Sequence, residues 1–135
     1  GFTLTGSMPD QPRNSYSRVE RYAGQGRTMR TCAVGDHFTF TFDMPLSCDS
    51  LLLRTGYAYL PRCIFNSGYV EVLYDGADAF EFYGELEGSR LTVIPSDRIK
   101  AVRMISSAGR NGESSVIVQP PLVYGRGGKL DQSSF

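Results

Sequence analysis

A two-residue hydrophobic period, clearest over residues 37–42, constrains the fold more than any other feature of the chain. There Phe38, Phe40 and Phe42 alternate with polar residues. Because successive side chains of a β-strand point to opposite faces of a sheet, this pattern predicts a strand with three aromatic rings on its buried face. No window shows the longer period of an amphipathic helix.

Other short apolar or alternating runs follow, separated by segments rich in Gly, Pro, Asn, Asp and Ser. We expect about eight strands, which fall at residues 37–42, 51–55, 69–74, 80–83, 91–93, 99–105, 115–119 and 122–124. Parallel strands need crossovers of about a dozen residues or more, usually helical, and the chain lacks that pattern. The sequence therefore predicts an all-β fold, an antiparallel β-sandwich with one shared core.

The length of 135 residues fits a single domain, residues 1–135, with its core over about residues 30–124. The polar stretch 10–26 is interpreted as a long connection that either is functional or wraps the surface. The glycine-rich end, residues 125–135, is interpreted as a flexible C-terminal tail with only Leu130 and Phe135 to anchor it.

Charge and hydropathy exclude two classes of partner. Fourteen Lys and Arg residues balance fourteen Asp and Glu residues, which leaves no excess of positive charge for a phosphate backbone. No stretch approaches the ~20 apolar residues of a membrane-spanning helix. We expect neither nucleic-acid binding nor membrane insertion.

The residues needed for metal binding or catalysis are sparse. Cys32, Cys48 and Cys63 form no C-x-x-C pair, and His37 is the only histidine, so no zinc site is expected. The three cysteines allow one internal disulfide at most, or three small buried side chains. Asp36 beside His37 would point to the opposite face of a strand, which argues against a Ser-His-Asp triad. We expect the isolated chain to be non-catalytic.

Two loops carry planar hydrogen-bonding and aromatic side chains. Residues 54–62 contain two tyrosines and two arginines and precede Asn66-Ser67-Gly68, and residues 110–113 read Arg-Asn-Gly-Glu. A sugar ring stacks its C–H face on Tyr and shares its hydroxyls with Arg, Asn and Glu, so this mixture is typical of a shallow sugar site. The alternative is that these residues only form turns.

The order of these segments resembles the discoidin, or coagulation factor five/eight type C, family of galactose-binding-like β-sandwiches, which are also grouped among carbohydrate-binding modules. The resemblance covers about two-thirds of the chain, and its most specific pieces are residues 70–76 with the Asp75-Gly76 turn and the strand bearing Arg103. Its remaining pieces are residues 34–42, 50–54, 66–69 and 115–119. The form Gly-Tyr-Val-Glu-Val before Asp-Gly is most similar to C-terminal accessory domains of bacterial secreted β-N-acetylhexosaminidases.

Two departures from that family matter. Many members hold a structural calcium, but here Ala23-Gly24 stands in the Asp-Gly place and Gln119 in the place of a glutamate, although Thr28 matches. The loss of two carboxylates removes most of the charge a calcium ion needs, so no cofactor is expected. The chain has no Trp, and Tyr57, Tyr59 or Tyr22 would have to provide the aromatic platform.

The resemblance implies a non-catalytic carbohydrate-binding module or accessory domain of a secreted glycoside hydrolase, similar to β-hexosaminidases, that tethers the enzyme to glycans. Its expected partners are a glycan with N-acetylhexosamine or galactose and a catalytic domain of the same chain. The expected location is secreted, periplasmic or at the cell surface. The alternative is a structural or protein-interaction domain that packs on its parent enzyme and binds no sugar. The candidate site residues are Tyr57 and Tyr59 for stacking, Arg62 and Asn66 for binding hydroxyls, and Arg110 and Asn111 for closing the rim.

Overall fold

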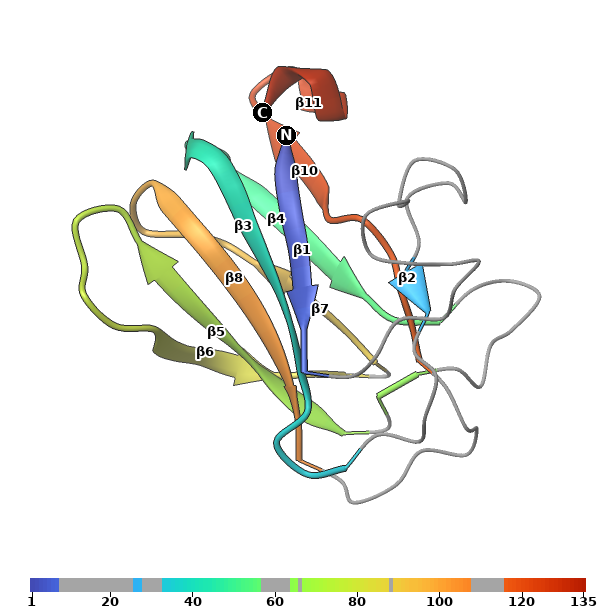
Figure 1. Cartoon of the computed structure of the whole chain (residues 1–135). Helices are drawn as coiled ribbons and strands as arrows, with labels where there is room; N and C mark the ends of the chain where they lie inside the picture. Colours follow the sequence, from blue (N-terminus) through green and yellow to red (C-terminus); the bar gives the residue numbers. More distant parts are fainter. Residues whose placement is uncertain (8–25, 28–32, 57–63, 66, 88, 108–115) are drawn as a thin grey trace.

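The computed structural model describes residues 1–7, 26–27, 33–56, 64–65, 67–87, 89–107 and 116–135. In this part of the chain two antiparallel sheets face each other, and the chain ends lie close together at one end of the sandwich (Figure 1). The predicted all-β sandwich is confirmed.

The larger sheet has five strands in the order β1-β3-β8-β5-β6. Its strands are β1 (Phe2–Gly6), β3 (His37–Leu46), β8 (Ile99–Ser106), β5 (Gly68–Tyr74) and β6 (Glu81–Glu85). The smaller sheet has the order β11-β10-β4-β7. Its strands are β11 (Gly128–Lys129), β10 (Leu122–Gly125), β4 (Ser50–Arg54) and β7 (Arg90–Val93). A short pair, β2 (Gly26–Arg27) with β9 (Ile117–Val118), and the 3-10 turn η2 (Gln132–Ser134) complete the described elements.

The core lies between the two large sheets and follows the predicted alternation. Phe38 and Phe40 on β3 are fully buried, and Phe42 is 5% exposed. Residues on neighbouring strands fill the layer between the sheets because each strand turns every second side chain inward. The other buried members of this cluster are Leu4, Leu46, Leu51, Leu53, Phe65, Val70, Val72, Val93, Ile99, Val102, Met104, Val116, Val118 and Val123.

The strand predicted at residues 80–83 is present as β6, but its side chains do not follow a simple alternation between the two faces. The β5–β6 register pairs Val70 with Gly84 and Glu71 with Phe82, which leaves Tyr83 as an extra residue at a β-bulge. Tyr83 packs against the core and its hydroxyl accepts a hydrogen bond from the backbone N–H of Ile94, whereas Phe82 is 61% exposed. Phe80 precedes the strand.

The C-terminal segment, which the sequence predicts to be a flexible tail, contains regular structure and packs on the sandwich. Residues 128–129 pair with β10, and Leu130 and Phe135 pack against the core. The ring of Phe135 lies 6.0 Å from that of Phe42 in an edge-on arrangement. The two anchors named from the sequence therefore do hold this segment, and β1 and β11 extend the two sheets beyond the predicted strands.

Across the described residues, no helix is long and apolar enough to cross a membrane.

Candidate functional site

All six predicted sugar-binding residues lie outside the described residues: Tyr57, Tyr59, Arg62, Asn66, Arg110 and Asn111. Tyr22, Ala23-Gly24 and Thr28 lie outside them as well. The structure does describe the residues on either side of these segments. Their contacts show where the segments join the sandwich.

We call the described residues next to these segments anchor points. One pair of anchor points lies on the larger sheet. The backbone N–H of Ser107, just after β8, donates to the carbonyl of Ser67, just before β5, at 3.2 Å. The two hydroxyls are 3.3 Å apart. Residue 66 and the segment that starts at residue 108 therefore attach to the sandwich at adjacent points.

A second pair of anchor points lies where β4 ends. The backbone N–H of Gly56 donates to the carbonyl of Ile117 at 2.7 Å, and Thr55 forms a β-bridge with Val118. The side-chain amide of Gln119 donates to the carbonyl of Gly56. The segment that starts at residue 57 thus attaches next to the strand that follows residues 108–115.

A buried polar network fixes the second anchor. The hydroxyl of Thr55 is 3.4 Å from the carbonyl of Ser89 and accepts a hydrogen bond from the backbone N–H of Phe65 at 3.1 Å. Ser89 has a φ of 65°, a left-handed conformation that is uncommon outside glycine. Both sides of residues 57–63 are therefore tied to one buried hydroxyl, because Thr55 precedes this segment and Phe65 follows it.

Asp36 organises the start of β3. Its carboxylate accepts hydrogen bonds from the Ser7 hydroxyl at 2.8 Å and from the backbone N–H of Ala33 at 2.6 Å. The side chain is 6% exposed. The imidazole of the neighbouring His37 lies instead 3.4 Å from the carbonyl of Gly35. The carboxylate of Asp36 therefore serves the chain connection rather than the histidine.

The described residues contain no group of three or more His, Cys, Asp and Glu side chains that could hold a metal ion. Gln119, which stands where the resembled family has a glutamate, offers an N–H to Gly56 in this structure. An amide oxygen can bind calcium, but it lacks the negative charge of a carboxylate, so Gln119 is a weaker ligand than the glutamate would be. The expectation of no cofactor stays a prediction, because several of the relevant positions lie outside the described residues.

Cys48 is the described cysteine, and it carries a free thiol that is partly buried. Burial, together with the neighbouring Asp49 carboxylate, raises the pKa of this thiol to about 11. A thiol with that pKa is protonated near neutrality and is a poor nucleophile. Cys32 and Cys63 lie outside the described residues.

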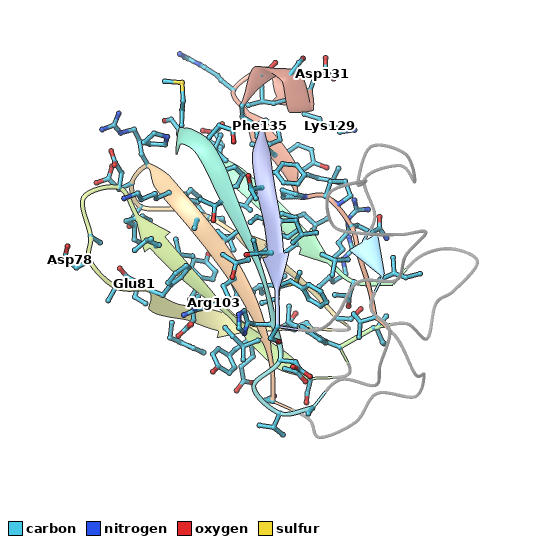
Figure 2. All side chains as sticks on the ribbon, viewed as in Figure 1. Asp78, Glu81, Arg103, Lys129, Asp131 and Phe135 are labelled. Carbon is cyan, nitrogen blue, oxygen red and sulfur yellow. The ribbon has the colours of Figure 1, made fainter. Side chains whose placement is uncertain are left out.

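The outer face of the larger sheet carries a paired charge and several aromatic rings. Arg103 on β8 donates through Nε and Nη2 to one carboxylate oxygen of Glu71 on β5, at 3.1 and 2.6 Å. Its guanidinium carbon lies 3.9 Å from the centre of the Phe80 ring. The rings of Tyr69 and Phe82 lie 6.0 Å apart nearby. We define this group as the Arg103 cluster; it lies away from Lys129 and Asp131 in Figure 2.

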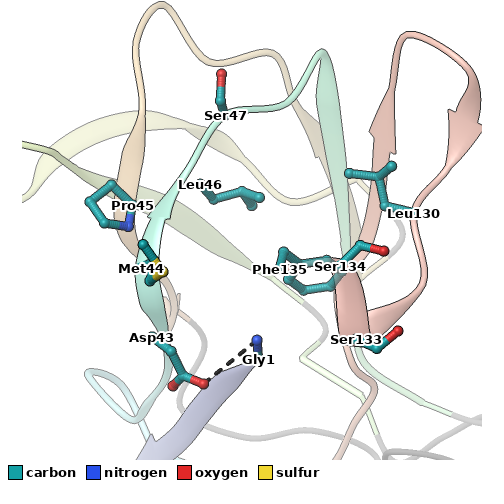
Figure 3. Close-up of a pocket in the computed structure, with 10 residues that line it drawn as sticks. All are labelled: Gly1, Asp43, Met44, Pro45, Leu46, Ser47, Leu130, Ser133, Ser134 and Phe135. Carbon is teal, nitrogen blue, oxygen red and sulfur yellow. Dashed lines mark ion pairs between the residues drawn. The ribbon is translucent and has the colours of Figure 1, made fainter.

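A pocket of about 500 Å³ opens beside the two ends of the chain (Figure 3). The chain ends contribute to its wall, and the N-terminal amine lies 3.6 Å from the Asp43 carboxylate. Its lining residues are Gly1, Asp43, Met44, Pro45, Leu46, Ser47, Leu130, Ser133, Ser134 and Phe135. A single carboxylate among apolar and hydroxyl side chains supplies no set of catalytic groups.

No family model matches the sequence, and no curated protein matches it. Solved structures do match. The family 32 carbohydrate-binding module of Clostridium perfringens NanJ, solved with galactose, has a TM-score of 0.61 and 11% sequence identity, and the match covers 90% of this chain and 92% of that one. A family 32 module of a GH31 enzyme, solved bound to N-acetylgalactosamine, has a TM-score of 0.65 and 8% identity, over 93% and 98% of the two chains.

A third match is chitosan-binding module 1 of a Paenibacillus chitosanase/glucanase, with a TM-score of 0.63, 15% identity and coverage of 92% and 95%. The chain therefore has the fold of family 32 carbohydrate-binding modules, which are galactose-binding-like, and the resemblance found in the sequence is confirmed at the level of the fold.

Proposed function

We propose that this chain is a non-catalytic carbohydrate-binding module of a secreted glycoside hydrolase, similar to β-hexosaminidases, and that it binds glycans carrying N-acetylhexosamine or galactose. The observation that carries the proposal is the likeness, over 90% or more of the chain, to modules solved with galactose and with N-acetylgalactosamine. A tethered module raises the concentration of glycan near the catalytic domain, so weak binding is sufficient.

The two pairs of anchor points support a sugar site near the end of β4 and the start of β5. We call this the loop end of the sandwich. Hydrogen bonds between Ser67 and Ser107, and between Gly56 and Ile117, bring together segments that are distant in the sequence. In this proposal Tyr57 and Tyr59 stack on the sugar ring, and Arg62 and Asn66 bind its hydroxyls. Arg110 and Asn111 close the rim from the opposite segment.

Titration of immobilised N-acetylhexosamine and galactose glycans tests both the function and the site. We expect wild type to be retained and Arg62→Ala to lose about tenfold in affinity, because an arginine shared between two hydroxyls contributes on the order of 1.5 kcal/mol. The matched control is Arg126→Ala, an exposed arginine in the β10–β11 turn, which should bind like wild type. Equal retention of all three proteins would contradict the site.

The competing function is a structural domain that packs on its parent enzyme. It would be favoured if wild type bound none of the glycans and yet associated with the catalytic domain expressed separately. Hydrolysis of a chromogenic hexosaminide by the isolated chain would contradict the non-catalytic role. Detection of the intact parent protein in the cytoplasm alone would contradict the proposed secreted, periplasmic or cell-surface location.

A further inference from the structure

The outer face of the smaller sheet brings two positive charges together. Arg54 on β4 and Arg90 on β7 are directly opposite each other in the strand register. Like charges at directly opposite positions destabilise a sheet. Within the described part of the chain, neither side chain forms an ion pair or a side-chain hydrogen bond. The fold therefore places two like charges at directly opposite positions in the sheet.

The guanidinium of Arg54 is only partly hydrated. Its Nε is buried, and that N–H has no hydrogen-bond partner. An unsatisfied buried donor is costly, and a charged one more so. Burial and the positive charge of Arg90 both lower the pKa of Arg54, and Tyr124 opposes this in part. An oxyanion beside the guanidinium would offset the positive charge of Arg54 and so reduce its repulsion by Arg90.

A hollow of about 320 Å³ lies beside Arg54. Lys129 and Asp131 line it as well, and the other lining residues are Pro120, Pro121, Leu122 and Leu130. Figure 2 shows Lys129 and Asp131 near the C-terminal end of the chain. Sites for small ligands start at about 300 Å³, so the hollow can take about one sugar unit.

We propose that this face, which we call the Arg54 face and define as Arg54, Arg90 and Lys129 with the adjoining hollow, binds the carboxylate or sulfate group of an acidic saccharide. The oxyanion lies against Arg54, and the apolar C–H face of the sugar lies on the proline and leucine walls. The Asp131 carboxylate repels the oxyanion, so the oxyanion binds at the Arg54 side of the hollow. The saccharide part of this inference rests on the proposed function, whereas the oxyanion part does not.

Binding is measured by calorimetry at low salt with a heparin-derived hexasaccharide and an oligogalacturonate as the sulfate and carboxylate probes. Chitohexaose is the neutral probe, and inorganic sulfate is the free anion. We expect at least one acidic saccharide to bind, and Arg54→Gln and Lys129→Gln each to weaken its binding about tenfold, because each removes one charge-assisted contact. Asp131→Asn is expected to strengthen the same binding a few-fold.

Lys100→Gln is the matched control. Lys100 is an exposed lysine on β8 of the other sheet, so this variant has the same net charge as Lys129→Gln but an unchanged Arg54 face. An equal loss in the two variants would overturn the proposal, because the attraction would then follow net charge alone. So would the absence of binding by both acidic saccharides, or binding of inorganic sulfate as tight as theirs. If Arg54→Gln fails to fold, the comparison of Lys129→Gln with Lys100→Gln still decides the question, because Lys129 is exposed.

The neutral probe separates this inference from the proposed function. If chitohexaose binding is lost in Arg62→Ala and retained in Lys129→Gln, the two sites are independent, as we infer. If no neutral glycan binds but an acidic saccharide does so through Lys129, the Arg54 face stands and the loop site falls. Equal binding of neutral and acidic probes to wild type and to Lys129→Gln would overturn the Arg54 face.

Discussion

The two outer faces of the sandwich use arginine in opposite ways. On the larger sheet, Arg103 is held by Glu71 and covered by Phe80, so its charge is neutralised within the fold. On the smaller sheet, Arg54 is opposite Arg90, and its Nε has no hydrogen-bond partner among the described residues. The same residue type therefore stabilises one face, while on the other it leaves a charge free to interact with a ligand.

The difference shows that the residue opposite an arginine in the strand register determines whether that arginine stabilises the sheet. Cross-strand pairs of opposite charge stabilise a sheet by a few tenths of a kcal/mol to about 1 kcal/mol, and like pairs destabilise it by similar amounts. A fold retains a like pair at a cost in stability. We interpret that cost as the physical mark of a binding face.

The largest effect is expected from Gly68→Ala, which breaks the larger sheet where β5 meets β8. A Cβ at this position would overlap the carbonyl oxygen of Ile105 and press on Leu86, so the two strands would have to separate. We expect a loss of about 3 kcal/mol in the free energy of unfolding, measured in urea. Gly127→Ala, where a Cβ meets nothing within 4 Å, is the control and should change stability little. Similar stabilities for the two variants would contradict the described β5–β8 contact.

A smaller effect is expected from Arg103→Ala. This change leaves the partly buried Glu71 carboxylate unpaired and uncovers Phe80, so we expect a loss of about 1–2 kcal/mol in urea unfolding. Lys100→Ala, an exposed neighbour on the same strand, should stay within about 0.5 kcal/mol of wild type. A double-mutant cycle with Glu71→Ala should give a coupling of roughly 1 kcal/mol. Zero coupling would mean that the Arg103 cluster is not a stabilising pair.

The smallest effect, of opposite sign, is expected from Arg90→Gln. Removal of the like charge opposite Arg54 should raise the free energy of unfolding by about 0.5 kcal/mol at low salt. At ~1 M salt the Debye length is about 3 Å, so the gain should nearly vanish. Urea unfolding at two salt concentrations measures this. A loss of stability at low salt would show that Arg90 has a structural partner, and the contrast between the two faces would then disappear.

Local patterns in the sequence predicted the fold well where a strand buries one side. The alternation around Phe38 and Phe40 reports burial directly, and both residues are in the core. The two-residue strands β2 and β11 carry no period, because they depend on partners that are distant in the sequence. The facing of Phe82 was harder to predict. Alternation indicates which residues share a face, but the β-bulge at Tyr83 interrupts the alternation along β6.

The candidate sites were less predictable for the same reason. Residue types nominated Tyr57, Arg62 and their neighbours for the sugar site, and those positions lie outside the described residues. Arg54 and Arg90 gave no local signal, because only the β4–β7 register makes them neighbours. A reader of the sequence would have needed the strand pairing to find the like-charge pair.

The anchor points at the loop end have a consequence for protein engineering. The described contacts join backbone groups and small hydroxyls of Gly56, Ser67, Ser107 and Ile117, with Thr55 and the Gln119 amide beside them, and all of these residues lie outside 57–63 and 108–115. Segments of other lengths and compositions could be grafted between the same points, because these hydrogen bonds would be kept. The sandwich is suited to display libraries in which new specificities are selected on a constant scaffold.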